Sequence, residues 1–280
     1  MGTAEEKQER LLEWLRERGS AAVAFSGGVD SAYLAWAARQ ALGDRALAVT
    51  ALAHSYPKRE GEEAHILAEQ IGIKREAFSF DEFQVPGFAE NPPNRCYYCK
   101  TAILTQIRGI AKSHGISCIV EGSNADDRGD YRPGMQAVRE QGVESPLMEA
   151  GLTKAEIRDL SRKAGLPTWE KQSAACLASR VAYGETITPE KLRMTELAEE
   201  YLRRLGIRGQ LRVRVHGSLA RLELPESYLP ELLREENREK ITGELKKLGF
   251  SYVTIDLQGY RMGSMNEVLC GLEREENKHE

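Results

Sequence analysis

Short apolar runs alternate along the first half of the chain with longer segments in which apolar residues recur every three or four positions. Short runs bounded by glycine or polar residues predict strands, and the recurring pattern predicts amphipathic helices. We predict strands at 21–25, 45–52, 74–80 and 116–120, and helices within 1–19, after 31, and at 58–71, 102–114 and 153–164. This alternation predicts an α/β fold with a mostly parallel sheet covered by helices on both faces.

The pattern changes in the last third of the chain. Thr188 and Pro189 are suited to begin a helix, as its N-cap and its first helical residue. The segments after that helix predict two strands, a largely helical stretch and a last strand, at 210–216, 218–224, 225–248 and 251–257. This order predicts a small C-terminal α+β domain, so we divide the chain into domains 1–185 and 186–280.

A glycine turn joins the first predicted strand to the helix after it. The residues of this turn are Ser26, Gly27, Gly28, Val29, Asp30 and Ser31. The N–H groups of a first helical turn have no intrahelical partner, and adjacent glycines let the backbone close around an anion. The second and fourth predicted strands lead into Ser55 and Gly122. Because the carboxyl ends of parallel strands share one edge, we expect all three segments to line one ligand site.

The turn from Ser26 to Ser31 resembles the PP-loop of the ATP pyrophosphatase superfamily, whose fold is HUP-like, or adenine nucleotide α-hydrolase-like. The turn lacks the lysine of the GxxxxGK[ST] loop and does not match GxGxxG. The resemblance implies cleavage of ATP to AMP and pyrophosphate, with the pyrophosphate in the loop and Asp30 at the Mg²⁺-bound phosphates. It also implies that the strand ends at Ser55 and Gly122 hold the nucleoside.

Composition narrows the function classes. The chain has 280 residues, and its 41% of hydrophobic residues is enough for a core. The net charge of −4 argues against a broad nucleic-acid surface. No apolar run is long enough to span a membrane, and the charged N-terminal segment is unlike a signal peptide. The five cysteines are an odd number, so we predict a cytoplasmic protein with reduced thiols.

Three of the cysteines suggest a metal centre. Cys96 and Cys99 form a CxxC after a proline break, a spacing found in zinc, iron–sulfur and redox sites. Cys176 supplies a third thiol among small residues, and no second CxxC or CxxH offers a fourth ligand. Three thiolates with an open position suit a [4Fe–4S] cluster. Cys118 lies in an apolar run and is expected to be buried, and Cys270 near the tail has no predicted role.

Several charged side chains are candidates for binding a substrate or phosphate. Arg212 and Arg214 alternate on one predicted strand, so they share a face on which two guanidinium groups suit phosphate or carboxylate. The alternative is a solvated face of the sheet. Ser179 and Arg180 closely follow the third thiol and join these candidates. The charged segment 126–134 is either a solvated loop or a cover for the site.

Six stretches along the chain resemble the LarE family, sulfur transferases that help build the nickel-pincer cofactor of lactate racemase. They are AFSGGVDS, NPPNRCYYCK, DYRPG, ACLASRVAYG, LRVRVHGSLARLELPE and GFSYVTIDLQGYRMGSMN. The resemblance implies that ATP adenylates the carboxylates of pyridinium-3,5-biscarboxylic acid mononucleotide and that sulfur displaces AMP. It also implies a phosphate grip by Arg212 and Arg214, a divalent metal on Glu199 and Glu231, and a homo-oligomer, commonly a hexamer.

Two sulfur sources are known in this family. Some members sacrifice a loop cysteine, which becomes dehydroalanine, and others transfer a sulfide bound to a [4Fe–4S] cluster on three cysteines. Because Cys96, Cys99 and Cys176 are all present, we predict the cluster type, and the sacrificial position is either Cys176 or the adjacent Ala175. The rival functions are a PP-loop tRNA thiolase, an ammonia-using ligase similar to NAD synthetase, and a non-enzymatic nucleotide sensor.

Overall fold

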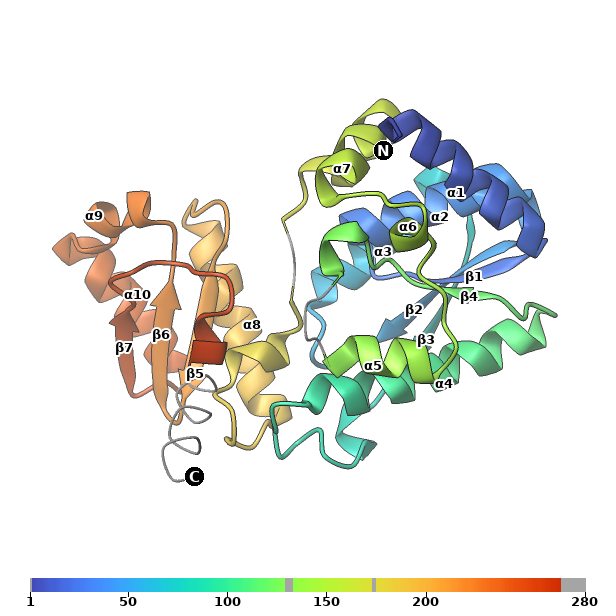
Figure 1. Ribbon diagram of the computed structural model, residues 1–280. Helices are drawn as coiled ribbons and strands as arrows, with labels where there is room; N and C mark the ends of the chain where they lie inside the picture. The colour runs from blue at the N-terminus through green and yellow to red at the C-terminus, as the bar shows by residue number, and fades with distance from the viewer. Residues whose placement is uncertain (1, 129–132, 173–174, 268–280) are drawn as a thin grey trace, which may run out of the picture. The chain divides into compact units, whose positions relative to one another are not determined.

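The computed structural model describes residues 2–128, 133–172 and 175–267. The chain forms two compact units, one of residues 1–85 and 94–174 and the other of 86–93 and 175–280. Figure 1 labels the helices and strands of both units. The predicted boundary after residue 185 therefore differs from this division by assigning 175–185 to the first unit, and segment 86–93 was not expected in the second.

The first unit is built on a parallel four-stranded sheet with the strand order β3-β2-β1-β4 (Figure 1). Its strands are β1 (Ala21–Ala24), β2 (Ala46–Leu52), β3 (Lys74–Ser79) and β4 (Ile119–Val120). Val23 of β1 lies beside Ala48 on one side and Val120 on the other. The strand order reverses direction between β1 and β4, which is where ligands bind in open parallel sheets.

Helices cover both faces of this sheet. Successive residues of a strand point to opposite faces, so each face presents apolar side chains that a layer of helices buries. Val23 packs into a core with one layer of helices, and Ala22 packs into a second core with the other layer. The first layer contains α1 (Ala4–Arg18), α2 (Val29–Leu42), α3 (Lys58–Ile71), α6 (Pro146–Glu149) and α7 (Lys154–Lys163). The second contains α4 (Arg95–Ser113) and α5 (Pro133–Glu140), which run below the sheet in Figure 1. The predicted α/β architecture is confirmed.

The second unit has the predicted order of helices and strands. Its three-stranded sheet has the order β5-β6-β7, with β5 (Arg212–His216) antiparallel and β7 (Tyr252–Ile255) parallel to β6 (Leu219–Glu223). The helices are α8 (Pro189–Arg204), α9 (Leu229–Leu232) and α10 (Glu235–Lys247). Among the described residues, no helix of either unit combines the length and apolar character needed to cross a membrane.

Asn91 fixes segment 86–93 within the second unit. Its side chain is fully buried and donates hydrogen bonds to the carbonyls of Val181 and Ala182, at 3.2 and 2.7 Å. Its φ of 56° lies in the left-handed region, which asparagine tolerates better than most residues. The Gly184 N–H donates to the Asn91 carbonyl at 3.1 Å, so the segment is bound through both side chain and backbone.

Three elements of the first unit differ from the prediction. Helix α4 begins at Arg95 rather than at 102. The prolines lie before its first turn, where a missing N–H removes no hydrogen bond of the helix. The strand predicted at 116–120 shortens to β4, and α5 forms at the end of the charged segment 126–134. Residues 129–132 of that segment, and Cys270, lie outside the described residues.

Candidate active site

A tight turn between β1 and α2 forms an anion cradle in the first unit. Gly27 has a φ of +72°, and a Cβ atom there would lie 2.9 Å from the Cβ atom of Ala64 in α3. Only glycine meets both conditions without displacing the helix. Gly28 is the N-cap of α2 and makes no side-chain cap, so the first-turn N–H groups of the helix are available to an anion.

The two serines of the cradle hold its shape. Their hydroxyl oxygens lie 3.0 Å apart, the Ser31 hydroxyl accepts from the Ser26 N–H at 3.3 Å, and it donates to the Gly28 carbonyl at 3.1 Å. Ser31 is buried, whereas Ser26 is exposed. We therefore expect Ser31 to act as a support of the turn and Ser26 to be the serine that a ligand can reach.

Asp30 brings an incompletely bound carboxylate to the cradle. Its Oδ2 atom forms an ion pair with the Lys154 ammonium, while its Oδ1 atom is buried and has no hydrogen-bond partner among the described residues. Burial raises the pKa of Asp30 above its ordinary value, although Lys154 opposes that shift. A carboxylate oxygen left over beside a phosphate cradle suits a hard cation, so Asp30 fits the predicted Mg²⁺ role.

Lys154 and Lys171 are cradle residues that no sequence motif indicated. The Lys171 ammonium lies 3.2 Å from the Gly27 carbonyl oxygen and pairs with Glu60 and Glu63 of α3, at 2.6 and 2.8 Å. Lys171 and Gly27 are 144 residues apart, so no local spacing links them. The ammonium ties the cradle to α3 and to the end of the first unit.

The other two strand ends meet the cradle in different ways. A Cβ atom on Gly122 would lie 3.0 Å from the Ser31 nitrogen, so glycine lets the chain after β4 pack directly on the cradle. Ser55 is buried, and its N–H donates to Oε1 of Glu82 at 2.5 Å. The His54 N–H donates to Oε2 of the same carboxylate at 3.1 Å. The backbone N–H of Ser55 is therefore already engaged within the protein, and its predicted nucleoside contact stays a prediction.

Glu82→Gln is expected to lower the free energy of unfolding of the first unit by about 1–3 kcal/mol, because one buried N–H of the 54–55 turn loses its acceptor. Glu82 is completely buried and provides one oxygen to each N–H group. Urea denaturation of the full chain measures the change. The exposed Glu69→Gln is the matched control and should change stability by less than about 0.5 kcal/mol. Equal stability of the two variants would contradict this role of Glu82.

The CxxC lies at the same edge of the sheet as the cradle. Cys96 and Cys99 stand one turn apart at the start of α4, on one helix face, and neither is in a disulfide. The next residue, Lys100, places its ammonium 3.0 Å from the Glu121 carboxylate. Glu121 directly precedes Gly122, which packs on the cradle. Lys100 and Glu121 thus connect the CxxC turn to the cradle within one unit.

Cys118 is buried, as predicted. Burial and the nearby Glu144 carboxylate raise the pKa of its thiol to about 12, and the sulfur lies 3.6 Å from Glu144 Oε1. A thiol with so high a pKa is almost entirely protonated near neutral pH, so it is a poor nucleophile and metal ligand. Cys118 is therefore a suitable control for the other thiols.

In the second unit, Cys176 is held by its backbone. Its carbonyl accepts from the N–H and the hydroxyl of Ser179, at 3.0 and 2.8 Å, and from the Arg180 guanidinium at 3.0 Å. Arg180 is buried and pairs with Glu199 at 2.8 Å. Burial opposes the charge of Arg180, but Glu199 outweighs it and raises the pKa of that guanidinium. The predicted pair Ser179 and Arg180 therefore positions the Cys176 peptide, and the thiol itself stays partly exposed.

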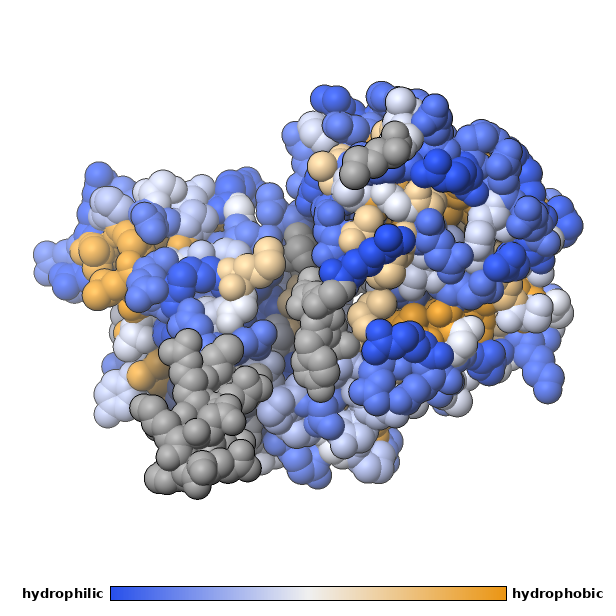
Figure 2. Space-filling model, in the orientation of Figure 1, coloured by the Kyte–Doolittle hydropathy of each residue, from blue (hydrophilic) through white to orange (hydrophobic). Residues whose placement is uncertain are grey.

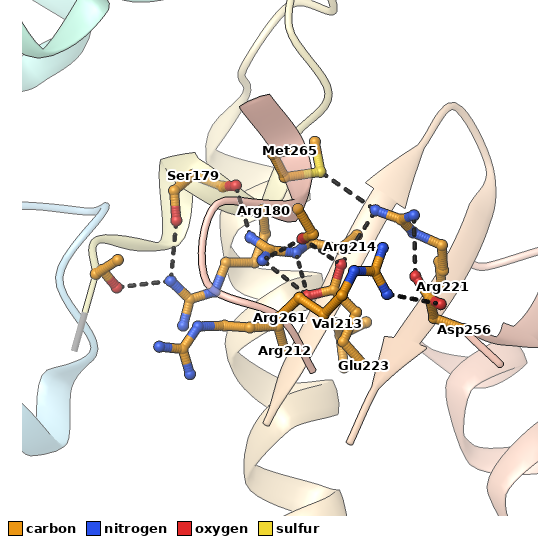
Figure 3. Close-up of polar contacts among 12 residues, drawn as sticks. Ser179, Arg180, Arg212, Val213, Arg214, Arg221, Glu223, Asp256, Arg261 and Met265 are labelled. Carbon is orange, nitrogen blue, oxygen red and sulfur yellow. Dashed lines mark hydrogen bonds and ion pairs between the residues drawn. The ribbon is translucent and has the colours of Figure 1, made fainter. Parts of the chain in front are cut away.

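Arg212 and Arg214 are buried, so the alternative of a solvated sheet face is wrong. Figure 3 shows Arg214 directed at Glu223, with its Nη2 and Nε atoms 2.8 and 3.0 Å from one carboxylate oxygen. Arg212 instead lies over the Tyr260 ring, 5.1 Å from its centroid. Burial, together with the nearby Arg180 charge, lowers the pKa of Arg212 to about 10. Arg212 also donates to the Leu211 carbonyl at 2.7 Å, and its predicted role in binding phosphate stays a prediction.

The two predicted metal carboxylates are both engaged with arginines. Glu199 accepts from Arg180 and from the Val213 N–H, and Glu231 on α9 lies 3.0 Å from Arg234 in an exposed ion pair. Within the described ranges, the one group of three His, Cys, Asp or Glu residues close enough to share a metal ion is His54, Asp81 and Glu82. The metal role of Glu199 and Glu231 therefore stays a prediction.

Comparison with known proteins decides the family. A model of the NAD synthase family matches residues 5–95, which contain the cradle. An uncharacterised protein of Synechocystis, slr1717, is 42% identical over 95% of this chain and 98% of its own length. The pyridinium-3,5-bisthiocarboxylic acid mononucleotide synthase of Lactiplantibacillus plantarum is 36% identical over 96% of this chain and 97% of its own length. The chain belongs to the LarE family.

Membership of the LarE family makes this chain an enzyme with a PP-loop. Its likeness to NAD synthetases is more limited, since the NH3-dependent NAD(+) synthetase of Pyrococcus horikoshii is 27% identical over 57% of this chain. The NAD synthase family model also ends at residue 95, before the CxxC. The three cysteines Cys96, Cys99 and Cys176 and the arginines of the second unit therefore lie outside the part of the chain that matches the NAD synthase family.

Proposed function

We propose that this LarE-family enzyme adenylates the carboxylates of pyridinium-3,5-biscarboxylic acid mononucleotide with ATP and replaces an oxygen of each with sulfur. The product is pyridinium-3,5-bisthiocarboxylic acid mononucleotide, the precursor of a nickel-pincer cofactor. Similarity to the named synthase along 96% of the chain supports the substrate class. The observation that carries the ATP chemistry is the glycine cradle beside the Asp30 carboxylate, of which one oxygen has no hydrogen-bond partner among the described residues.

The cradle suits the first half-reaction. A substrate carboxylate oxygen attacks the α-phosphorus of ATP, the bond to the bridging oxygen of the β-phosphate breaks, and pyrophosphate leaves. The first-turn N–H groups of α2 have no intrahelical partner, so they would bind the negative charge that develops on the leaving pyrophosphate. Asp30 would hold Mg²⁺, which neutralises phosphate charge when bound.

The second unit supplies cations for the mononucleotide phosphate. Arg180 and Arg214 each pair with a buried carboxylate, and Arg180 also holds the Cys176 peptide. Arg212 is buried and lies over the Tyr260 ring, so we assign the phosphate to it, with Ser179 and Arg180 holding the loop beside it.

Cys96, Cys99 and Cys176 would hold a [4Fe–4S] cluster, which supplies an open iron for sulfide. The thiols of the CxxC fit this role because they share one helix face at the cradle edge and neither is in a disulfide. Cys176 would be the third ligand, as the likeness to the LarE family implies. Sulfide attacks the acyl carbon of the adenylate, and AMP leaves with the electrons of the carbon–oxygen bond.

The alternative sulfur source is Cys176 itself. Its thiolate would attack the acyl adenylate and displace AMP to give a thioester. Removal of the Cα proton would then break the Cβ–sulfur bond, which leaves dehydroalanine in the chain and releases the thiocarboxylate. The partly exposed thiol on a backbone that Ser179 and Arg180 hold in place favours this second possibility. The cluster remains the first choice because all three cysteines are present.

None of the four described cysteines is in a disulfide, which suits the reducing cytoplasm that we propose for this enzyme.

We also propose a homo-oligomer, for which the second unit offers exposed apolar side chains such as Leu233, Tyr252 and Leu257. Figure 2 shows an apolar area beside α9, and the exposed Leu233 directly follows that helix. Light scattering of the purified protein measures the assembly, and a monomer at all concentrations would contradict it.

Anaerobic reaction of the purified protein with ATP, Mg²⁺, sulfide and the biscarboxylic mononucleotide tests the function. We expect AMP and pyrophosphate to form only with the mononucleotide, and mass spectrometry to show exchange of oxygen for sulfur. Turnover with tRNA would instead support a tRNA thiolase, and turnover with ammonia would support an amidating ligase. Binding of ATP without any cleavage would indicate a nucleotide sensor.

A further inference from the structure

A lysine with little exposed surface lies in the corner between the cradle and helix α3. The Lys171 ammonium is 2.6 Å from the Glu60 carboxylate, 2.8 Å from that of Glu63 and 3.2 Å from the Gly27 carbonyl oxygen. Only 17% of its side chain is exposed. Gly27 packs on Ala64, which lies one turn after Glu60 on the same helix. Lys171 therefore joins the turn to the helix against which the turn rests.

Helix α7 fixes the backbone of Lys171. Arg158 on that helix donates to the carbonyls of Trp169 and Lys171, to the second at 2.9 Å. The Lys171 N–H donates to the Thr168 carbonyl, also at 2.9 Å. An ammonium has three donors, and the two carboxylates and the Gly27 carbonyl are all within its reach. The residue is thus held by α7 through its backbone and by α3 through its charge.

The peptide bond between Gly27 and Gly28 connects this lysine to the side of the cradle that a ligand enters. The bond is trans, so its carbonyl and its N–H point in opposite directions. The Gly27 carbonyl faces Lys171, and the Gly28 N–H on the other side donates to the hydroxyl of the exposed Ser26 at 3.4 Å. Because this hydrogen bond is longer than usual, an anion can replace it.

We propose that Lys171 is a positioning residue that directs the Gly28 N–H toward the pyrophosphate part of ATP. Two adjacent glycines allow their shared peptide to rotate, and the hydrogen bond from Lys171 to the Gly27 carbonyl holds it in one orientation. The ammonium stays behind the turn and makes no contact to phosphate. The inference rests on the ATP use proposed above and adds to it a residue that prepares the cradle before the nucleotide enters.

Lys171→Met is therefore expected to separate the ligands of the site. The variant should bind Mg–ATP and pyrophosphate about tenfold more weakly, because the Gly28 N–H is no longer held in place for them. Its affinity for AMP should change by less than about twofold, because AMP has no β- or γ-phosphate to place in the cradle. Calorimetry with the full chain measures the three affinities. An equal loss for all three ligands, or no loss for Mg–ATP, would overturn the inference.

A double variant separates the hydrogen bond from the charge. Lys171→Met leaves Glu60 and Glu63 without their shared cation, and that negative charge would itself repel phosphate. Lys171→Met combined with Glu60→Gln has the same net charge as the three unmodified side chains, but it lacks the donor to the Gly27 carbonyl. It should bind Mg–ATP as weakly as Lys171→Met. Recovery of the unmodified affinity in the double variant would overturn the inference.

Two further variants complete the test. Lys171→Arg keeps a charged donor and should recover most of the Mg–ATP affinity. Arg10→Met is the matched control, because Arg10 also joins remote segments by donating to a carbonyl, that of Ala150 at 3.0 Å, and its loss should leave all three affinities unchanged. If Lys171→Met does not fold in urea denaturation, the double variant carries the comparison of ligands. Failure of the unmodified protein to bind Mg–ATP would instead contradict the proposed function.

Discussion

Replacement of Cys176 by alanine is expected to abolish thiocarboxylate formation and to leave pyrophosphate release in the presence of substrate within about twofold of the unmodified enzyme. The thiol acts after adenylation, and Arg180 binds the carbonyl of residue 176, which alanine also provides. Phosphate assay and mass spectrometry follow the two half-reactions separately. Loss of both together would contradict a role of Cys176 in sulfur transfer alone.

Two further thiol variants separate the sulfur sources. Cys118→Ala is the control and should leave both half-reactions unchanged, because its thiol is buried with a pKa of about 12. Cys99→Ala should remove the iron–sulfur absorption and the product if a cluster carries the sulfide. Product formation limited to one sulfur per chain, with dehydroalanine at 176, would show that the cysteine is sacrificed.

Glu199→Gln is expected to destabilise the second unit by about 3–5 kcal/mol, because it leaves the Arg180 charge buried without a counter-charge. Both side chains are less than one-tenth exposed, at 3% for Arg180 and 7% for Glu199. Urea denaturation measures the loss. Glu231→Gln, whose ion pair with Arg234 is exposed, should cost less than about 0.5 kcal/mol. Similar small losses in both variants would contradict the structural role of Glu199.

The effect of Glu199 should also depend on pH. Burial opposes its charge, but Arg180, Arg212 and the Val213 N–H outweigh burial and hold the pKa of Glu199 below the ordinary 4.5. A lowered carboxyl pKa stabilises the folded state above the unfolded value, and this stability is lost as the pH falls below it. The stability difference between the unmodified enzyme and Glu199→Gln should therefore be full near neutral pH and shrink below about pH 4.5.

The fold was predictable because its signals are local. The apolar runs and the capping box at Thr153 mark elements within a few residues, and α3 has the bounds expected from its pattern. The start of α4 was missed because the CxxC residues give no apolar periodicity, although helix geometry places both thiols on one face. Asn91 carried no signal at all, since its two acceptors lie 90 and 91 residues further along the chain.

The site was predictable only in part. Glycine spacing gave the cradle, and strand order gave its neighbours, but the partners of its charges come from remote positions. Lys154 lies 124 residues from Asp30, and Glu82 lies 27 from the Ser55 turn that it holds. The sequence also did not show which charged side chains are buried. Arg180 and Glu199 were therefore predicted to bind ligands, although the two also form an internal ion pair.

The path of segment 86–93 affects how the enzyme is made. Asn91 leaves the ribosome 90 residues before Val181, and at usual rates of synthesis that is an interval of about 5–18 s. A gene fragment that begins at residue 175 would encode the second unit without this buried asparagine. Exchange of that unit between relatives must therefore transfer two separate stretches of coding sequence together.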